Sequence, residues 1–119
     1  MTRSEILVNE MKGGFAAAEA KDAIDIGNDH VVDVSGFKRV IIAFHLSAAT
    51  AEDTITVKAG TGEPAFRRAL GDLVYSCAGG AAEVVLGPLE TARFIRPDGT
   101  IHIDVAGSTI AGFIDAYGL

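Results

Sequence analysis

Hydrophobic and polar residues alternate along most of the chain from residue 22 onward, which is the period-two pattern of strands with one buried face. The clearest run is TITVKA at 54–59, and TIHIDV at 100–105 shows the same alternation. A longer strand is predicted to begin near Phe37, and its inward face consists of Val40, Ile42, Phe44 and Leu46. Its opposite face is also partly apolar, so we expect this strand to be covered on both sides for part of its length.

Shorter strands are predicted between clear turn signals. They cover residues 22–26, 30–34, 73–78, 83–86, 91–96 and 109–117. The strongest turn signal is Pro97-Asp98-Gly99, because proline presets φ and glycine accepts a positive φ. Strands that recur about every 8–12 residues favour a sandwich or barrel over a β-α-β fold. We therefore predict an all-β domain over residues 22–119, an antiparallel, jelly-roll-like β-sandwich of about eight strands.

Residues 1–21 do not follow this alternation and are interpreted as an N-terminal arm. A glycine pair at 13–14 separates an apolar patch from an alanine-rich run, in which a short helix is possible. We favour an arm that lies along a surface, because its apolar side chains have little reason to face water. The candidate partner-binding residues of the arm are Ile6, Leu7, Val8, Met11 and Phe15. The alternative is that the arm packs on its own domain.

A second interruption, residues 60–71 (GTGEPAFRRALG), is a long connection between two strands, named loop 60–71 below. Loops of this length in a small domain are often functional. It carries the adjacent basic pair Arg67 and Arg68 beside Phe66, and arginine and aromatic residues are enriched at protein interfaces. These three residues are the second set of candidate partner contacts. The alternatives are a solvated pair of arginines, or ion pairs with acidic residues of the same chain.

Composition limits the function classes. The chain has 119 residues and a mass of 12.3 kDa, which fits one domain. Ten Lys and Arg stand against sixteen Asp and Glu, and the net charge of -6 argues against nucleic-acid binding, which needs a basic face. The longest wholly apolar run, Val40 to Phe44, is far shorter than the ~20 residues of a membrane span. The first dozen residues lack a secretory signal, so we expect a soluble protein made in the cytoplasm.

No arrangement of reactive residues predicts a catalytic or metal site. His30, His45 and His102 occupy three separate strands without a His-x-His pair, so we predict two exposed histidines, one partly covered and no metal. Four aspartates between residues 22 and 33 lack the spacing of a calcium loop. The single cysteine, Cys77, is interpreted as a buried core thiol.

Motifs for nucleophilic catalysis and nucleotide binding are also missing. There is no Gly-x-Ser-x-Gly elbow around Ser35, and the segment Gly60-Thr61-Gly62 lacks the third glycine of a dinucleotide fingerprint and the lysine of a phosphate loop. We therefore predict a protein without catalytic residues or cofactors, and not an enzyme.

Several segments resemble small β-rich proteins encoded among the head genes of tailed bacteriophages. They are residues 31–40, 56–60, 87–94 and 97–103. Such proteins are auxiliary, or decoration, capsid proteins, sandwich domains that bind the outside of an expanded shell and reinforce it. The resemblance implies a location on the capsid surface, the major capsid protein as partner, and a homo-oligomer with a trimer favoured. It carries no catalytic residues to transfer.

Physical reasoning agrees with this resemblance. A shell offers hundreds of identical sites, so modest contacts suffice when they are repeated. In this interpretation the arm reaches a neighbouring subunit or the shell protein. One alternative is a head–tail joining or tail tube protein built on the same sandwich. Another is a carbohydrate-binding or adhesive sandwich, but sugar sites prefer aromatic platforms, and this chain has no Trp and only Tyr75 and Tyr117 as tyrosines.

Overall fold

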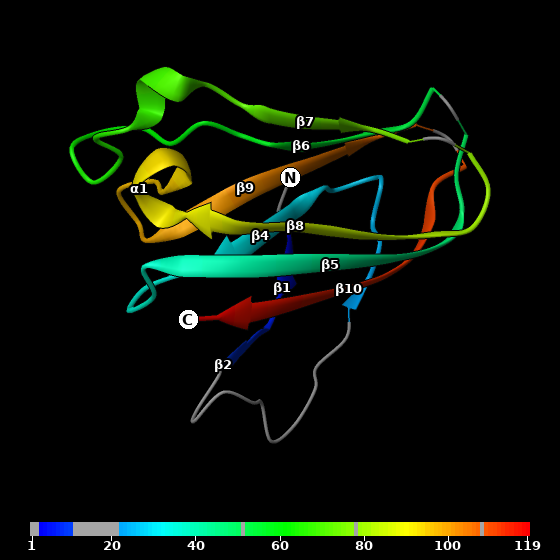
Figure 1. Cartoon of the computed structure of the whole chain (residues 1–119), viewed down its shortest axis with the longest axis horizontal. Helices are drawn as coiled ribbons and strands as arrows, with labels where there is room; N and C mark the ends of the chain where they lie inside the picture. The colour runs from blue at the N-terminus through cyan, green and yellow to red at the C-terminus, as the bar shows by residue number, and fades with distance from the viewer. Residues whose placement is uncertain (1–2, 11–21, 51, 78, 108) are drawn as a thin grey trace.

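Two β-sheets packed face to face form the molecule in the computed structural model, which confirms the prediction of an all-β sandwich (Figure 1). The structure describes residues 3–10, 22–50, 52–77, 79–107 and 109–119. The strands are β1 (Ser4–Ile6), β2 (Val8–Glu10), β3 (Asp22–Ala23), β4 (His30–Asp33), β5 (Arg39–Ala48), β6 (Thr54–Val57), β7 (Leu73–Ser76), β8 (Ala82–Glu90), β9 (Thr100–Ala106) and β10 (Ala111–Gly118). They are accompanied by a 3-10 turn, η1 (Arg68–Leu70), and a one-turn helix, α1 (Thr91–Phe94).

The sheets differ in detail from the purely antiparallel arrangement that was predicted. One sheet has the order β1-β4-β9-β6-β7, and the other has β2-β10-β5-β8, with β3 also paired to β10. β1 pairs parallel with β4 and β2 parallel with β10, whereas the other pairings are antiparallel, so both sheets are mixed. The described residues form ten strands rather than about eight, because the N-terminal segment adds short ones. The jelly-roll arrangement stays a prediction.

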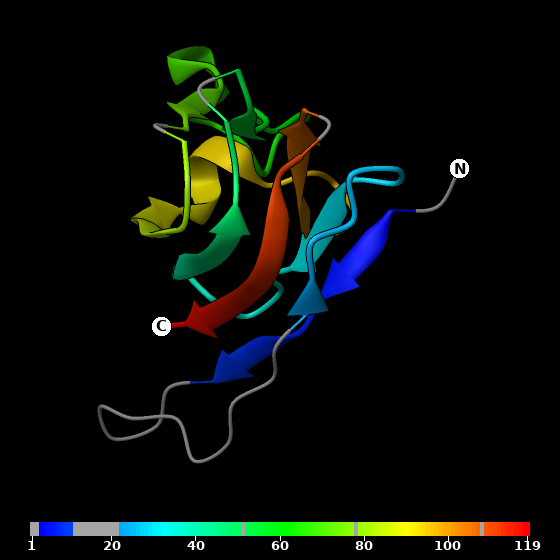
Figure 2. The same cartoon turned by 90° about the vertical axis from the view of Figure 1, so that its right-hand side faces the viewer.

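The N-terminal segment closes one side of the sandwich. β1 lies at the edge of one sheet and β2 at the edge of the other, with only Leu7 between them, so the chain crosses from sheet to sheet (Figure 2). Strands that change sheets in this way form the corners of sandwiches. Residues 4–10 are thus built into the sandwich, as in the alternative in which the arm packs on its own domain. Met11 and Phe15 lie outside the described residues.

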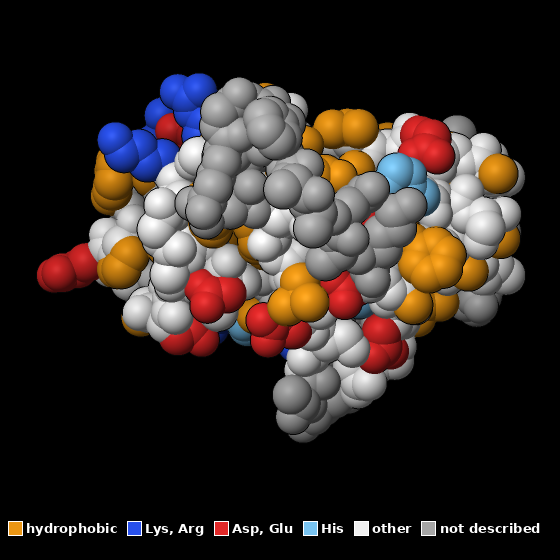
Figure 3. Space-filling view, turned by 90° about the horizontal axis from the view of Figure 1, so that it is seen from below, with side chains coloured by type: hydrophobic (Ala, Val, Ile, Leu, Met, Phe, Trp, Pro, Cys, Tyr) orange, Lys and Arg blue, Asp and Glu red, His pale blue; other side chains and the backbone are white. Residues whose placement is uncertain are grey.

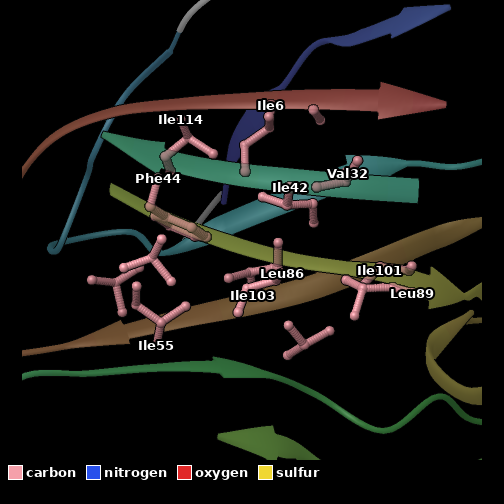
Figure 4. Packing of buried hydrophobic residues seen from close by; sticks show 14 of the residues in the cluster. Ile6, Val32, Ile42, Phe44, Ile55, Leu86, Leu89, Ile101, Ile103 and Ile114 are labelled. Carbon is pink, nitrogen blue, oxygen red and sulfur yellow. The ribbon is translucent and has the colours of Figure 1, made fainter. Parts of the chain in front are cut away.

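Alternate positions of the long strands supply the core between the sheets. Val40, Ile42, Phe44 and Leu46 of β5 are all buried, as predicted, and the intervening residues of β5 from 41 to 45 are half-buried. Isoleucines of β6, β9 and β10 meet this face from the facing and neighbouring strands (Figure 4). The cluster includes Ile6, Val32, Ile55, Leu86, Leu89, Ile101, Ile103 and Ile114.

The strand predicted over residues 91–96 is wrong, because residues 91–94 form α1. The hydroxyl of Thr91 donates to the Lys38 carbonyl at 3.1 Å, and the amide of Ile95 donates to the Thr91 carbonyl at 2.8 Å. Tertiary contacts therefore override the local strand preference. The turn predicted at Pro97-Asp98-Gly99 is present, with Gly99 at φ +83°. Among the described residues, no helix is long and apolar enough to cross a membrane.

Candidate interaction site

Loop 60–71 connects β6 to β7 at one end of the sandwich and folds against α1. The amide of Gly60 donates to the Arg93 carbonyl at 2.9 Å, and the amide of Arg67 donates to the Ala92 carbonyl at 3.0 Å. The approach at Gly60 is so close that a Cβ there would lie 2.2 Å from the carbonyl oxygen of Ile95, so this position requires glycine. Backbone bonds to α1 therefore fix the path of the loop.

Two arginine side chains brace the loop by donating to its carbonyl groups. Arg68 donates through Nη1 to the carbonyls of Gly62 at 2.9 Å and Ala65 at 3.1 Å. Arg93, from α1, donates through Nε to the Gly71 carbonyl at 3.0 Å, and its guanidinium lies 4.7 Å from the centre of the Phe94 ring. A guanidinium with several donors in a fixed plane suits this bracing role.

Asp72 joins the two ends of the loop. It accepts a hydrogen bond from the amide of Ala59 at 2.6 Å and another from the Lys58 ammonium at 3.1 Å. The backbone bond from Ala59, helped by Lys58, lowers the pKa of the Asp72 carboxyl from its usual value. The carboxylate is therefore ionised at neutral pH, and it holds the start of the loop beside the start of β7.

The arginine pair makes contacts within the chain, as one sequence-based alternative proposed. Arg67 pairs with Glu90 at 2.9 Å, but both side chains are about half exposed, and surface pairs of this kind contribute little to stability. Arg68 is committed to the loop carbonyls through one of its nitrogens. Both arginines are still exposed at the surface, so the pair lies at the rim of the loop.

Phe66 is the outstanding feature of this loop, because its side chain is 76% exposed. It follows Ala65, which is completely buried, so the backbone is anchored immediately before the ring. The braced loop thus presents an aromatic ring to solvent from a fixed backbone. A partner that accepts this ring in a pocket would therefore not have to order the loop backbone, which lowers the entropic cost of binding.

The candidate residues of the N-terminal segment have different environments. Ile6 is 1% exposed and belongs to the core between the sheets, so it serves the fold of its own chain. Val8 is half-buried against the same core. Leu7, at the crossing between the sheets, is 52% exposed. Of these three residues, Leu7 presents the most apolar surface for an external contact.

A polar cluster that sequence reasoning missed lies on the outer face of the second sheet. His45 of β5 bonds Asp115 of β10 through Nε2 at 2.7 Å, and its Nδ1 bonds Glu83 of β8. Asp115 is buried. The bond to Asp115, together with that to Glu83, raises the pKa of His45. A protonated imidazole can donate to both carboxylates, so the cluster links three neighbouring strands.

The other two histidines differ from each other and from the prediction of two exposed residues. His30 is fully buried and His102 is half-buried, so the exposed positions expected from the strand pattern are wrong. His30 accepts a hydrogen bond from the amide of Asp25 through Nε2 at 2.9 Å, and burial lowers the pKa of its imidazole. Cys77 is buried, as predicted, and burial raises the pKa of its thiol.

A shallow cleft of about 260 Å³ separates β7 from the end of β8 and α1, next to loop 60–71. Leu73, Pro88 and Phe94 are among its lining residues.

Comparisons with family models, with curated proteins and with solved structures found no match for this chain. The functional argument therefore rests on the chain's own residues.

Proposed function

We propose that this protein is a non-enzymatic structural protein of a phage virion, which binds the outside of a capsid shell and reinforces it. The proposal rests on the resemblance of four sequence segments to decoration proteins. It is supported by the small all-β sandwich, the fold class that this resemblance implies. The major capsid protein is the proposed partner, and the surface of the virion is the proposed location.

The observation that carries the proposal is the exposed ring of Phe66 on the braced loop 60–71. Interface hot spots are typically aromatic or arginine side chains that fill a pocket on the partner. Phe66 supplies the aromatic anchor, and the exposed Arg67 and Arg68 beside it supply polar contacts at its rim. A loop held by hydrogen bonds to α1 fits this role better than a flexible one, because binding then requires little ordering.

Repetition supplies the rest of the binding strength. Each domain offers only a small apolar surface at Phe66, which is suited to a modest single contact. On a shell, contacts between neighbouring copies add to the contact with the shell itself, so the assembly is more stable than any single contact. The resemblance implies a homo-oligomer with a trimer favoured, and such a ring would place several Phe66 loops on one face.

The test is binding of single-residue variants to expanded shells of the capsid protein. Replacing Phe66 with alanine should weaken binding by at least about 2 kcal/mol, or roughly 30-fold in Kd. Phe113→Ala is a matched control, because Phe113 of β10 is also about half exposed, at 53%. Equal binding by Phe66→Ala and the intact protein would contradict the role of the loop.

A separate variant tests the N-terminal segment. Deleting residues 1–21 would also remove Ile6 from the core, so loss of binding after that deletion has two explanations. Leu7→Ser changes an exposed side chain between β1 and β2 and leaves the core intact. If the segment contacts the shell, this variant should bind more weakly and unfold like the intact protein. Unchanged binding would remove Leu7 from the interface.

A further inference from the structure

The outer edge of β7 carries none of the charged residues or prolines that commonly protect an edge strand. In the described part of the chain, β6 is the strand that pairs with β7, and the other edge of β7 is unpaired. Its sequence, Leu73-Val74-Tyr75-Ser76, has no charge and no proline. By contrast, the edge strand β8 of the facing sheet contains Pro88 and two glutamates. Unprotected edges are available for pairing with another strand.

The hydrogen-bond pattern shows which backbone groups of β7 point outward. The amide of Cys77 donates to the Asp53 carbonyl of the neighbouring chain segment at 2.9 Å. Because bonded and non-bonded pairs alternate along an antiparallel ladder, Tyr75 and Leu73 bond to β6. Val74 and Ser76 therefore direct their backbone N–H and C=O groups to the free edge. The side chain of Val74 is 57% exposed.

We propose that β7 pairs antiparallel with β7 of a second copy of this chain, around a two-fold axis at Tyr75. Val74 of each chain then exchanges two backbone hydrogen bonds with Ser76 of the other, so all four outward-pointing residues are satisfied. This register also keeps side chains on matching faces, because residues directly opposite in a ladder point to the same side. The dimer contact extends the sheet across both copies and does not rest on the proposed binding to a shell.

A two-fold axis at Val74 instead of Tyr75 would give a less favourable pairing. It would place Asp72 of one copy opposite Ser76 of the other. The carbonyl of Asp72 already accepts a hydrogen bond from Arg93 at 3.2 Å. An axis at Tyr75 leaves this intrachain bond untouched and uses the groups that are free.

Charge favours an antiparallel partner. At the end where β7 begins, loop 60–71 and the residues bonded to it or to its ends carry four basic and three acidic side chains. The basic ones are Lys58, Arg67, Arg68 and Arg93, and the acidic ones are Glu63, Asp72 and Glu90. At the end where β7 finishes, the segments 47–54 and 77–83 contain Glu52, Asp53 and Glu83 and no Lys or Arg. Antiparallel pairing brings the basic end of one copy to the acidic end of the other, whereas parallel pairing would bring like charges together. On the face drawn in Figure 3, Lys and Arg also gather at one end, whereas Asp and Glu are spread along the face.

Sedimentation equilibrium of the purified protein tests the dimer. Two short strands make a small contact, so the measurement should run from ~10 µM to ~1 mM. The mass is expected to rise with concentration from 12.3 kDa toward twice that value. Val74→Lys should abolish the rise, because it places a charge on the pairing edge, whereas Val85→Lys, at a 64% exposed valine of β8, should not. A mass that stays at one chain throughout the range would overturn the proposal.

A backbone variant and a cross-link make the test specific to this register. Val74→Pro removes the outward N–H but no bond to β6, so it should lose dimerisation and keep the circular dichroism of the intact protein. In a Cys77→Ala background, Tyr75→Cys should form a disulfide-linked dimer on mild oxidation, because facing residues at the axis have Cα atoms about 4.5 Å apart. Val85→Cys in the same background should stay monomeric on a non-reducing gel. A dimer that survives both Val74 substitutions, or that forms no disulfide at Tyr75, would contradict this pairing.

Discussion

The N-terminal strand can be tested through Ile6, whose side chain is 1% exposed between the two sheets. Ile6→Ala removes three carbon atoms, which at ~0.8 kcal/mol for each buried carbon corresponds to about 2.4 kcal/mol of transfer free energy. The surrounding side chains belong to two hydrogen-bonded sheets and can collapse only partly into the space. The cavity term therefore raises the expected loss of unfolding free energy to about 3–4 kcal/mol.

Urea unfolding followed by circular dichroism measures this loss. The midpoint should fall strongly while the slope of free energy against urea stays the same, because the variant still folds to the same structure. Leu7→Ala is the control, since Leu7 is the next residue and is 52% exposed, and its cost should stay below about 0.5 kcal/mol. A loss below about 1 kcal/mol for Ile6→Ala, or equal losses for both variants, would refute the placement of β1 in the core.

Further predictions concern the pH response and two tight packing positions. The pKa of His45 is raised, chiefly by Asp115, so its stabilising contribution is full below about pH 6.5 and is lost as the pH rises through the raised value. The difference in unfolding free energy between the intact protein and His45→Gln should therefore shrink from pH 6 to pH 9; a constant difference would contradict this reasoning. His30 is present in both proteins, so its contribution to the pH dependence of stability, which has the opposite sign because its pKa is lowered, does not enter this difference. Gly107→Ala should destabilise by more than about 1 kcal/mol, because φ is +141° and a Cβ would lie 1.7 Å from an oxygen of Asp53; an unchanged melting temperature would contradict it. Asp53→Ala should cost about 1–3 kcal/mol in a urea titration, because the buried carboxylate accepts bonds from the Thr50 amide and the Thr109 hydroxyl, and a cost near zero would argue against those bonds.

Local alternation was sufficient to predict most of the sandwich. The run at 54–59 contains β6, the run at 100–105 covers β9 except for its last residue, and the inward face assigned to the long strand is the buried face of β5. Strands of this kind show their buried face in a window of a few residues. The all-β class followed from the spacing of these strands and their turns.

Non-local contacts explain what the sequence did not reveal about the fold. β1 and β2 are three residues each, and Val8 pairs with Ala116 near the other end of the chain. Nothing in the neighbouring sequence signals such a partner. The helical turn at Thr91 depends in the same way on the Lys38 carbonyl and on loop 60–71.

The candidate site was also predictable only where local sequence determines it. Loop 60–71 and its exposed Phe66 were identified from the length of the interruption and from residue type, but the bracing by Arg68 and Arg93 depends on three-dimensional contacts. The cluster around His45 was missed because its partners are 38 and 70 positions away, on different strands. Assembly with a shell remains a proposal.

The most direct test of the proposed function is the stoichiometry of binding to expanded shells built from the capsid protein. The purified, intact protein is mixed with shells at increasing ratios and at several salt concentrations, and the pelleted amount is measured. Saturable pelleting at a fixed ratio to the shell subunits is the expected result. Absence of pelleting at every salt concentration would contradict the proposal and favour a tail or glycan-binding role.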